Sequence, residues 1–169
     1  FDRARGVAVV FGGSTNAGDT NETWEFDGTT WSLATPAASP PSCVFANMTY
    51  DDAGARTIMR CGIVFPRTTW AYDGTTWTQL APNGTPGLVN ASLAYDPLRR
   101  GAVLWDETRD WLLVGDDWVA TPSLNRPSER ANATLAYAGV ERAMVLFGGD
   151  TSLGQLGETY LLRLAAAEQ

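Results

Sequence analysis

The sequence predicts an all-β fold. Residues 24–31 read Trp-Glu-Phe-Asp-Gly-Thr-Thr-Trp, and residues 70–77 repeat this segment with two changes. An Asp-Gly pair between short runs of aromatic and β-branched residues is a strong hairpin signal. The 169 residues include 17 Gly, 9 Pro and 7 Trp, and no run of ten or more residues has apolar positions at helical spacing. Each copy is therefore expected to form a β-hairpin rather than part of a helix.

The hairpins also predict a register. A type I′ turn centred on Asp27 and Gly28 places Trp24 opposite Trp31, and the second copy places Trp70 opposite Trp77 in the same way. Aromatic cross-strand pairs of this kind stabilise a sheet by about 0.2–1 kcal/mol each. A more divergent third copy occupies residues 111–118.

The first two repeats contain the same elements in the same order. Each has an apolar strand, a loop, a hairpin with its tryptophans and a second loop. In the first repeat these are a turn and strand over residues 1–13, a polar loop over 14–22, the hairpin over 24–31 and a Pro-rich loop over 36–41. The second repeat begins with a strand over 44–50, a turn over 51–56 and a strand over 57–62.

The third and fourth repeats follow the same order with more divergence. Strands are expected over 91–95 and 102–105 in the third repeat, and over 133–137, 143–149 and 158–164 in the fourth. Matching aromatic positions lie at Phe1, Tyr50, Tyr95 and Tyr137, separated by 49, 45 and 42 residues. This period is typical of four-stranded propeller blades.

The count predicts fourteen strands in one domain over residues 1–169. The units run roughly over 1–41, 42–86, 87–128 and 129–169. The first unit lacks an inner strand and the last lacks an outer strand, so the array is incomplete at both ends. We therefore expect these residues to be four consecutive units of a larger propeller, or a second chain to complete the ring or cover its open faces.

The residues resemble kelch repeats. A glycine pair closes an apolar strand at residues 12–13 and again at 148–149, followed by an aromatic residue, a turn and a Trp. The Asp-Gly-Thr-Thr-Trp variety resembles secreted bacterial kelch proteins, and the resemblance covers essentially the whole chain. In the second and third repeats the pair is Cys61-Gly62 and Asp106-Glu107. The resemblance implies a kelch-like β-propeller.

The same resemblance implies that two sets of loops lie on one face. These are the loops between the second and third strands of each blade, and the loops that join one blade to the next. A rigid scaffold commonly binds its partners through such loops. The candidate ligand-binding residues in them are Asn16, Asp19, Arg67, Arg126 and Asp150.

Composition restricts the function. The chain has no histidine, which removes the Ser-His and Cys-His pairs and the imidazole metal ligands. No catalytic residue, cofactor or metal is assigned. A carboxylate pair could still hydrolyse a glycoside, with Asp106 and Glu107 or Asp116 and Asp117 as candidates. Solvation of turns and strand ends explains these residues as well.

The tryptophans have two interpretations. Aromatic faces can stack on sugar rings, but six of the seven tryptophans recur in the repeated hairpins, as core residues of a blade would. The seventh, Trp105, stands where the other repeats have Phe11 and Phe147, so it too is interpreted as core.

Charge argues against two classes of partner. The chain has twelve basic residues, all arginine, and 19 carboxylates. The resulting net charge of −7 disfavours binding to nucleic acid and to anionic membranes. No stretch of about 18 apolar residues is present, so membrane insertion is not expected.

The two cysteines have two interpretations, a disulfide bond or buried free thiols. Cys43 begins one strand and Cys61 ends the next, at the same end of a hairpin. Extending the register places the residue opposite Cys43 near Val64, so the bond would run diagonally. Cys61 also replaces a glycine of the repeat, which is compatible with an inert buried thiol.

Five sequons point to the cell exterior. The motif Asn-X-Ser/Thr occurs more often than composition predicts, and the functional interpretation is N-linked glycosylation. Duplication of the repeat in an organism that does not glycosylate it is the alternative. The sequons are at Asn21, Asn47, Asn83, Asn90 and Asn132.

These observations predict a non-catalytic extracellular or cell-surface module that presents loops to protein or glycan partners. Two alternatives stay open. One is a carboxylate-dependent glycan hydrolase or lyase. The other is a structural subunit of a surface polymer, with further copies of the chain as partners on an open edge.

Overall fold

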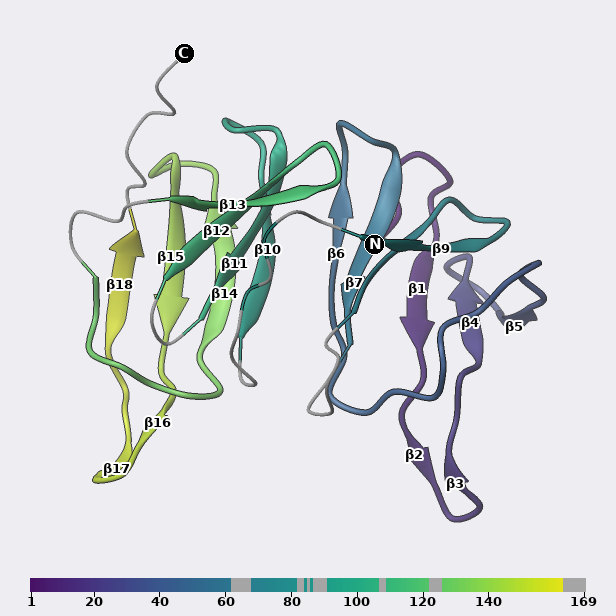
Figure 1. The fold of residues 1–169 in the computed structure, drawn as a ribbon, viewed down its shortest axis with the longest axis horizontal. Coiled ribbons are helices and arrows are strands. Elements are labelled where there is room, and N and C mark those ends of the chain that lie inside the picture. Colours follow the sequence, from purple (N-terminus) through teal and green to yellow (C-terminus); the bar gives the residue numbers. More distant parts are fainter. Residues whose placement is uncertain are drawn as a thin grey trace. The chain divides into compact units, whose positions relative to one another are not determined.

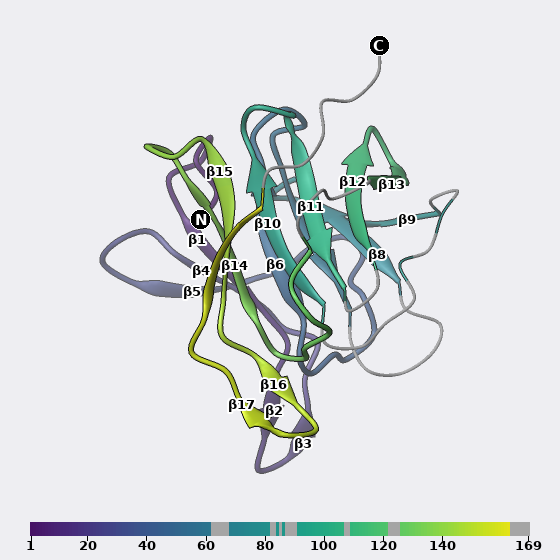
Figure 2. The same ribbon diagram turned by 90° about the vertical axis from the view of Figure 1, so that its left-hand side faces the viewer.

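The computed structural model describes residues 1–61, 68–81, 84, 86, 91–106, 109–121 and 126–162. It contains two compact units, Phe1–Pro82 and Asn83–Gln169, which are described separately. The fold is all-β, and its main sheets are antiparallel with three, four, four and three strands in chain order (Figures 1 and 2). These sheets are propeller-like blades, and among the residues just given the first and last blades have three strands each, as predicted. Within the described residues, no helix is long and apolar enough to cross a membrane.

The first unit holds blades 1 and 2. Blade 1 has the order β1-β4-β5, and blade 2 has the order β6-β7-β8-β9. A two-stranded hairpin, β2-β3, extends beyond β1 and β4 (Figure 1). The bounds are β1 Ala8–Phe11, β2 Ser14–Thr15, β3 Gly18–Asp19, β4 Thr23–Phe26, β5 Trp31–Ala34, β6 Asn47–Asp51, β7 Arg56–Arg60, β8 Thr69–Tyr72 and β9 Trp77–Leu80.

The second unit holds blades 3 and 4. Blade 3 has the order β10-β11-β12-β13, and blade 4 has the order β14-β15-β18 with a hairpin, β16-β17, beyond it. Figure 1 shows this hairpin leaving the ends of β15 and β18. The bounds are β10 Ser92–Asp96, β11 Gly101–Trp105, β12 Asp110–Val114, β13 Asp117–Thr121, β14 Thr134–Ala138, β15 Ala143–Phe147, β16 Asp150–Thr151, β17 Gly154–Gln155 and β18 Thr159–Leu162.

One backbone hydrogen bond establishes which residues are equivalent among the blades. In each blade, the backbone N–H of the residue that directly follows β1, β7, β11 or β15 donates to the backbone carbonyl of the residue that directly precedes the next strand of that sheet, β4, β8, β12 or β18. The four bonds are Gly12 to Glu22, Cys61 to Thr68, Asp106 to Arg109 and Gly148 to Glu158, at 2.9–3.1 Å. Phe11, Arg60, Trp105 and Phe147 are therefore equivalent, as are Thr23, Thr69, Asp110 and Thr159.

The predicted register of the first hairpin is wrong. Trp24 lies opposite Leu33, and Trp31 lies opposite Phe26, two residues from the predicted pairing. The rings of Phe26 and Trp31 stack with centroids 5.0 Å apart.

The second hairpin differs from the prediction in the same way. Trp70 lies opposite Gln79, and Trp77 lies opposite Tyr72. The Tyr72 and Trp77 rings stack with centroids 4.9 Å apart.

Asp27 explains the shift. Its carboxylate accepts the backbone N–H groups of Thr29 and Thr30, both at 2.8 Å, so Asp27 is the first residue of the turn. The turn is centred on Gly28 and Thr29, one residue later than predicted, with Gly28 at φ 98°. The hydrogen bonds from Thr30 and Thr29 hold the pKa of Asp27 below its usual value.

Within each unit, two blades pack face to face. We call the face that carries the Phe11 and Thr23 positions the rear face of a blade, and the opposite face, with the Trp24 and Trp31 positions, the front face. In the first unit, Phe11 on the rear of blade 1 packs with Met59, Tyr72 and Trp77 on the front of blade 2. In the second unit, residues of the blade 3 rear pack with residues of the blade 4 front, among them Val103, Trp105, Leu112, Leu146 and Leu162.

Candidate binding site

Two loops of blade 4 meet beside the β16-β17 hairpin. Asp150 and Ala131 exchange two backbone hydrogen bonds of 2.8 and 2.9 Å, which join the hairpin to the segment that precedes β14. Gly149 allows this approach because its φ is 102° and a Cβ there would lie 2.8 Å from the Ala131 carbonyl oxygen. The second residue before β14, Asn132, has φ 56° and donates its side-chain amide to Asp150 Oδ2 at 3.0 Å.

This arrangement borders an open depression of about 280 Å³. Its polar lining combines amide, hydroxyl and carboxylate groups, and its apolar lining includes an aromatic ring. Such a mixture suits a ligand with many hydroxyl groups, because carboxylates accept from hydroxyls, amides both donate to and accept from them, and apolar groups cover ring faces. The lining residues are Asn132, Thr134, Phe147, Gly148, Gly149, Asp150, Gln155 and Leu156.

Arg130 supports the loops that carry this depression. Its side chain is fully buried and donates to the Gly148 carbonyl at 3.2 Å, to Ser128 Oγ at 2.9 Å and to Glu158 Oε2 at 3.1 Å. Its guanidinium lies 4.8 Å from the centre of the Tyr160 ring. The hydrogen bonds from Tyr160 and Arg130 lower the pKa of Glu158, which keeps that carboxylate ionised opposite the arginine.

The structure places the predicted ligand-binding residues in different blades. Asp150 lines the depression, whereas Asn16 and Asp19 are exposed on the β2-β3 hairpin of the other unit. Arg126 donates to Asp110 Oδ1 at 2.8 Å and lies 5.3 Å from the Trp105 ring centre, so blade 3 already holds its guanidinium. Arg67 lies outside the described residues.

The sequence prediction missed most of the depression. Thr134 and Gln155 were not singled out, and Asn132 was singled out only as a sequon. An Asn two residues before a strand is compatible with a left-handed backbone, and this was the one local signal. The meeting of Asn132 with Asp150 depends on tertiary contacts between segments 18 residues apart.

The candidate catalytic carboxylates have structural contacts. Asp106 is buried, and it accepts the Arg109 backbone N–H at 2.7 Å and the Trp111 indole N–H at 2.9 Å. Asp116 lies in the β12-β13 turn and Asp117 begins β13. The other candidate, Glu107, lies outside the described residues.

The first tryptophan of each hairpin has a structural hydrogen bond. Trp24 donates to Glu22 Oε2, Trp70 to Thr68 Oγ1 and Trp111 to Asp106 Oδ2, each at 2.9 Å. Tyr160, at the same position in blade 4, donates to Glu158 at 2.8 Å. Trp105 is fully buried. These contacts support a structural role for the repeated aromatics.

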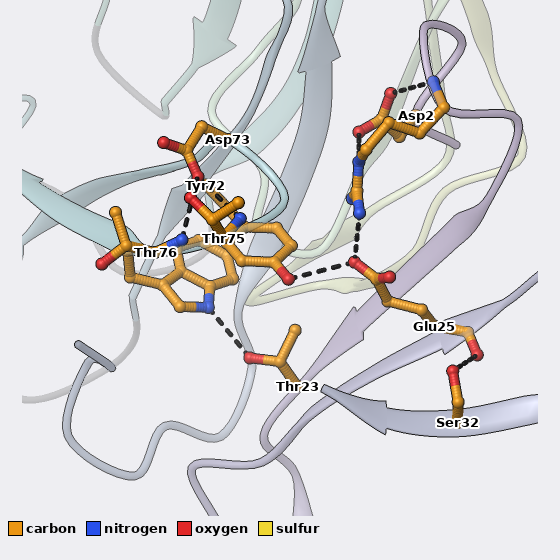
Figure 3. A network of polar contacts seen from close by, with 10 residues as sticks. Asp2, Thr23, Glu25, Ser32, Tyr72, Asp73, Thr75 and Thr76 are labelled. Carbon is orange, nitrogen blue, oxygen red and sulfur yellow. Dashed lines mark hydrogen bonds and ion pairs between the residues drawn. The ribbon is translucent and has the colours of Figure 1, made fainter. Parts of the chain in front are cut away.

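A polar network joins blades 1 and 2 (Figure 3). Arg5 bridges the buried Asp2 and Glu25, with both N···O distances at 2.7 Å, and Tyr72 donates to Glu25 Oε1 at 3.0 Å. Burial opposes ionisation of Asp2, but the hydrogen bonds from Arg5 outweigh it and lower the pKa of Asp2. Burial and the hydrogen bond to Glu25 raise the pKa of Tyr72 to about 12.

Cys43 and Cys61 form a disulfide, with their Cα atoms 6.0 Å apart. The strands pair Asn47 with Arg60, so a straight continuation would carry Cys43 past Cys61. Phe45 has φ 58°, and this left-handed residue turns the chain before β6. The extrapolated register failed at Cys43 because Cys43 does not lie in the strand.

Blade 4 fastens the equivalent positions without cysteine. Arg130 lies four residues before β14, as Cys43 lies four residues before β6, and its guanidinium bonds to the carbonyl of Gly148, the equivalent of Cys61. The disulfide and the buried arginine thus hold the same loop to the same strand end.

Three sequons fall in the described part of the chain. Asn21 is exposed and donates to the Pro40 carbonyl at 3.4 Å, Asn47 begins β6, and Asn132 bonds to Asp150. The hydroxyl residue of the first sequon, Thr23, is buried, so the motif there also has a structural explanation. Asn83 and Asn90 lie outside the described residues.

Comparison with known structures supports the fold. The chain superposes on the structure of YjhT with a TM-score of 0.62 at 14% sequence identity, covering 87% of this chain and 52% of YjhT. The chain thus spans about half the length of that protein. Comparison of the sequence with protein-family models and with curated proteins finds no match. At this level of identity the similarity shows the fold alone: an all-β protein of propeller-like blades.

Proposed function

We propose that the chain is a non-catalytic binding module of the kelch type, and that the depression beside Asp150 receives a neutral glycan. The observation that carries the proposal is the convergence of Asn132, Asp150 and Gln155 around an open, partly apolar hollow. A carboxylate at its edge and a net charge of −7 disfavour an anionic ligand. No catalytic residue is assigned, and the kelch assignment rests on the glycine pairs and the repeated Trp hairpins.

The proposal places the module outside the cell or on its surface. The Cys43–Cys61 disulfide supports an oxidising compartment. The exposed side chain of Asn21, in a sequon, is compatible with an N-linked glycan there. For Asn132 we propose the ligand contact instead, because its amide already bonds to Asp150 at the depression.

Calorimetric titration tests the proposed ligand class. The probes are maltotriose and triacetylchitotriose as neutral oligosaccharides and trigalacturonate as an anionic one. We expect a neutral probe to bind, and Asp150→Ala and Asn132→Gly to weaken its binding at least about tenfold, the effect of about 1.4 kcal/mol in lost hydrogen bonds. Glycine is chosen at Asn132 because it keeps the left-handed backbone.

The matched control is Glu141→Ala, which removes an exposed carboxylate from the β14-β15 turn of the same unit. This variant should bind like the wild type. Unchanged affinity in Asp150→Ala would contradict the site. Failure of both neutral probes, or preference for trigalacturonate, would contradict the ligand class.

A further inference from the structure

The front face of blade 1 is an uncovered apolar surface. Trp24 on β4 lies opposite Val10 on β1 and opposite Leu33 on β5. Phe26 lies opposite Trp31, two residues further along β4, so these five side chains share one face of the sheet. Trp31 and Leu33 are each 49% exposed, and Val10 is 45% exposed. Exposed apolar groups clustered in this way mark an interaction surface.

The rear face of blade 4 is also uncovered. Phe147 lies opposite Thr159, and Val145 lies opposite Leu161 on the same face. Phe147 is 53% exposed, Leu161 is 47% exposed, and Thr159 is also exposed. This face has the same position in blade 4 that Phe11 and Thr23 have in blade 1.

Inside the first unit, two such faces already dock on each other. The Phe11 ring meets the Trp77 ring edge to face with centroids 5.1 Å apart. The Trp77 indole N–H donates to Thr23 Oγ1 at 2.9 Å, and Tyr72 donates to Glu25. Trp77 is 2% exposed as a result, whereas its equivalent Trp31 is half exposed.

The uncovered faces carry the same complementary groups. Phe147 stands at the position of Phe11, and Thr159 stands at the position of Thr23. Trp31, at the position of Trp77, offers the indole N–H that Thr159 would accept. The apolar and polar contacts at the centre of the internal interface can therefore all be formed again.

One contact of the internal interface, the hydrogen bond between Tyr72 and Glu25, has apolar residues at both equivalent positions of the uncovered faces. In the internal interface, Glu25 accepts the Tyr72 hydroxyl. On the rear face of blade 4, Leu161 stands at the position of Glu25. On the front face of blade 1, Phe26 stands at the position of Tyr72, so neither a hydroxyl nor a carboxylate is left without its partner. A carboxylate facing Phe26, or a tyrosine hydroxyl facing Leu161, would have been buried unpaired.

We propose that the rear face of blade 4 docks on the front face of blade 1 of a second copy of this chain. Phe147 packs against Trp31 edge to face, and the Trp31 indole N–H donates to Thr159 Oγ1. Phe147 also lines the depression beside Asp150, so docking on this face and glycan binding in the depression exclude each other. The contact is head to tail, so a pair of copies keeps one free front face and one free rear face, and further copies can add. A second copy is the occupant because both halves of the interface are present in the same chain.

Sedimentation velocity with two blocked variants tests the proposal. Trp31→Asp blocks only the front face of blade 1, and Phe147→Asp blocks only the rear face of blade 4. We expect the wild-type mass to rise with protein concentration and each variant alone to stay monomeric. An equimolar mixture of the variants should form a dimer and nothing larger, since each chain contributes one intact face.

Further variants separate docking from misfolding. Leu33→Asp and Leu161→Asp block the same two faces at other positions and should repeat the result if an aspartate at Trp31 or Phe147 impairs folding. Val140→Asp replaces a residue that is 91% exposed in the β14-β15 turn and should associate like the wild type. Thr159→Val removes only the acceptor and should weaken association about three- to tenfold.

Three results would overturn the proposal. Self-association of Phe147→Asp alone would indicate a symmetric contact between front faces. A variant mixture that stays monomeric would exclude head-to-tail docking. A wild-type monomer at all concentrations would indicate that blade 4 of the same copy, or another segment, covers the face.

Discussion

The indole nitrogen of Trp77 lies 2.9 Å from the hydroxyl oxygen of Thr23, which joins the last strand of blade 2 to the middle strand of blade 1. Both residues are buried. Thr23→Val keeps the shape of the side chain but leaves the indole N–H without an acceptor, so it should lower the free energy of unfolding by about 1–3 kcal/mol. Urea denaturation measures the change. The exposed Thr78 on β9 provides the control, and a Thr23→Val loss no greater than that of Thr78→Val would contradict this role.

Trp77 and Trp31 allow a matched comparison of one position in two blades. Trp77→Ala should cost about 3–5 kcal/mol because it removes a side chain enclosed by both blades. Trp31→Ala should cost less than about 1 kcal/mol in dilute, monomeric protein, since its side chain is half exposed. Both values come from denaturant titrations below the concentration at which the chain associates. Equal losses would mean that the Trp31 face is covered within the monomer.

The hydroxyl of Tyr72 should titrate at a higher pH than a tyrosine of the unfolded chain. Burial and the hydrogen bond to Glu25 raise its pKa to about 12 in the folded protein, whereas an unfolded tyrosine titrates near about 10. The resulting stabilisation is complete below the unfolded pKa and is lost as the pH rises through about 12. Burial also raises the pKa of Tyr50, so the test compares amplitudes in the ultraviolet absorbance of tyrosinate. The late step should lose the amplitude of one tyrosine in Tyr72→Phe, and an unchanged late amplitude in this variant would contradict the assignment.

The sequence predicted the strands better than the contacts between loops. The repeated turns and spaced aromatics predicted the strands of the main sheets, because strand formation depends on local pattern, whereas the polar loop expected over 14–22 contains the β2-β3 hairpin. The turn register was wrong because Asp is compatible both with the first and with a central position of a turn, and only the hydrogen bonds from Thr29 and Thr30 distinguish them.

The disulfide and the depression show the same limit. The disulfide runs diagonally from Cys43 because the backbone of Phe45 is left-handed. This conformation is unusual for a bulky residue, and no sequence pattern predicts it. Asn132 and Asp150 meet only because Gly149 lets two loops approach. Such approaches are tertiary, so a periodic pattern does not encode them.

The disulfide should contribute measurably to stability. The 18-residue separation of Cys43 and Cys61 predicts a loss of about 3 kcal/mol on removal, from the greater entropy of the unfolded chain. The double variant Cys43→Ala/Cys61→Ala should unfold at lower urea concentration than the oxidised wild type, and reducing agent should affect only the wild type. Equal midpoints for reduced and oxidised wild type would show that the bond is absent in solution.

Native material should carry glycan at Asn21 if the chain is exported by a glycosylating cell. Its side chain is exposed, whereas Asn47 lies in a paired strand. Intact mass spectrometry should show heterogeneity that a peptide-N-glycosidase removes and that Asn21→Gln reduces. A single mass equal to that of the bare chain would contradict this part of the proposal.

The central claim is that the loops beside Asp150 bind the ligand, while the first tryptophan of each hairpin has a structural role within its own blade. Amide and indole NMR resonances recorded during titration with maltotriose and triacetylchitotriose test it most directly. The account predicts shifts confined to residues 131–134 and 147–156, with the indole N–H signals of Trp24, Trp70 and Trp111 unchanged. Shifts centred on those indoles, or no shifts with either sugar, would contradict it.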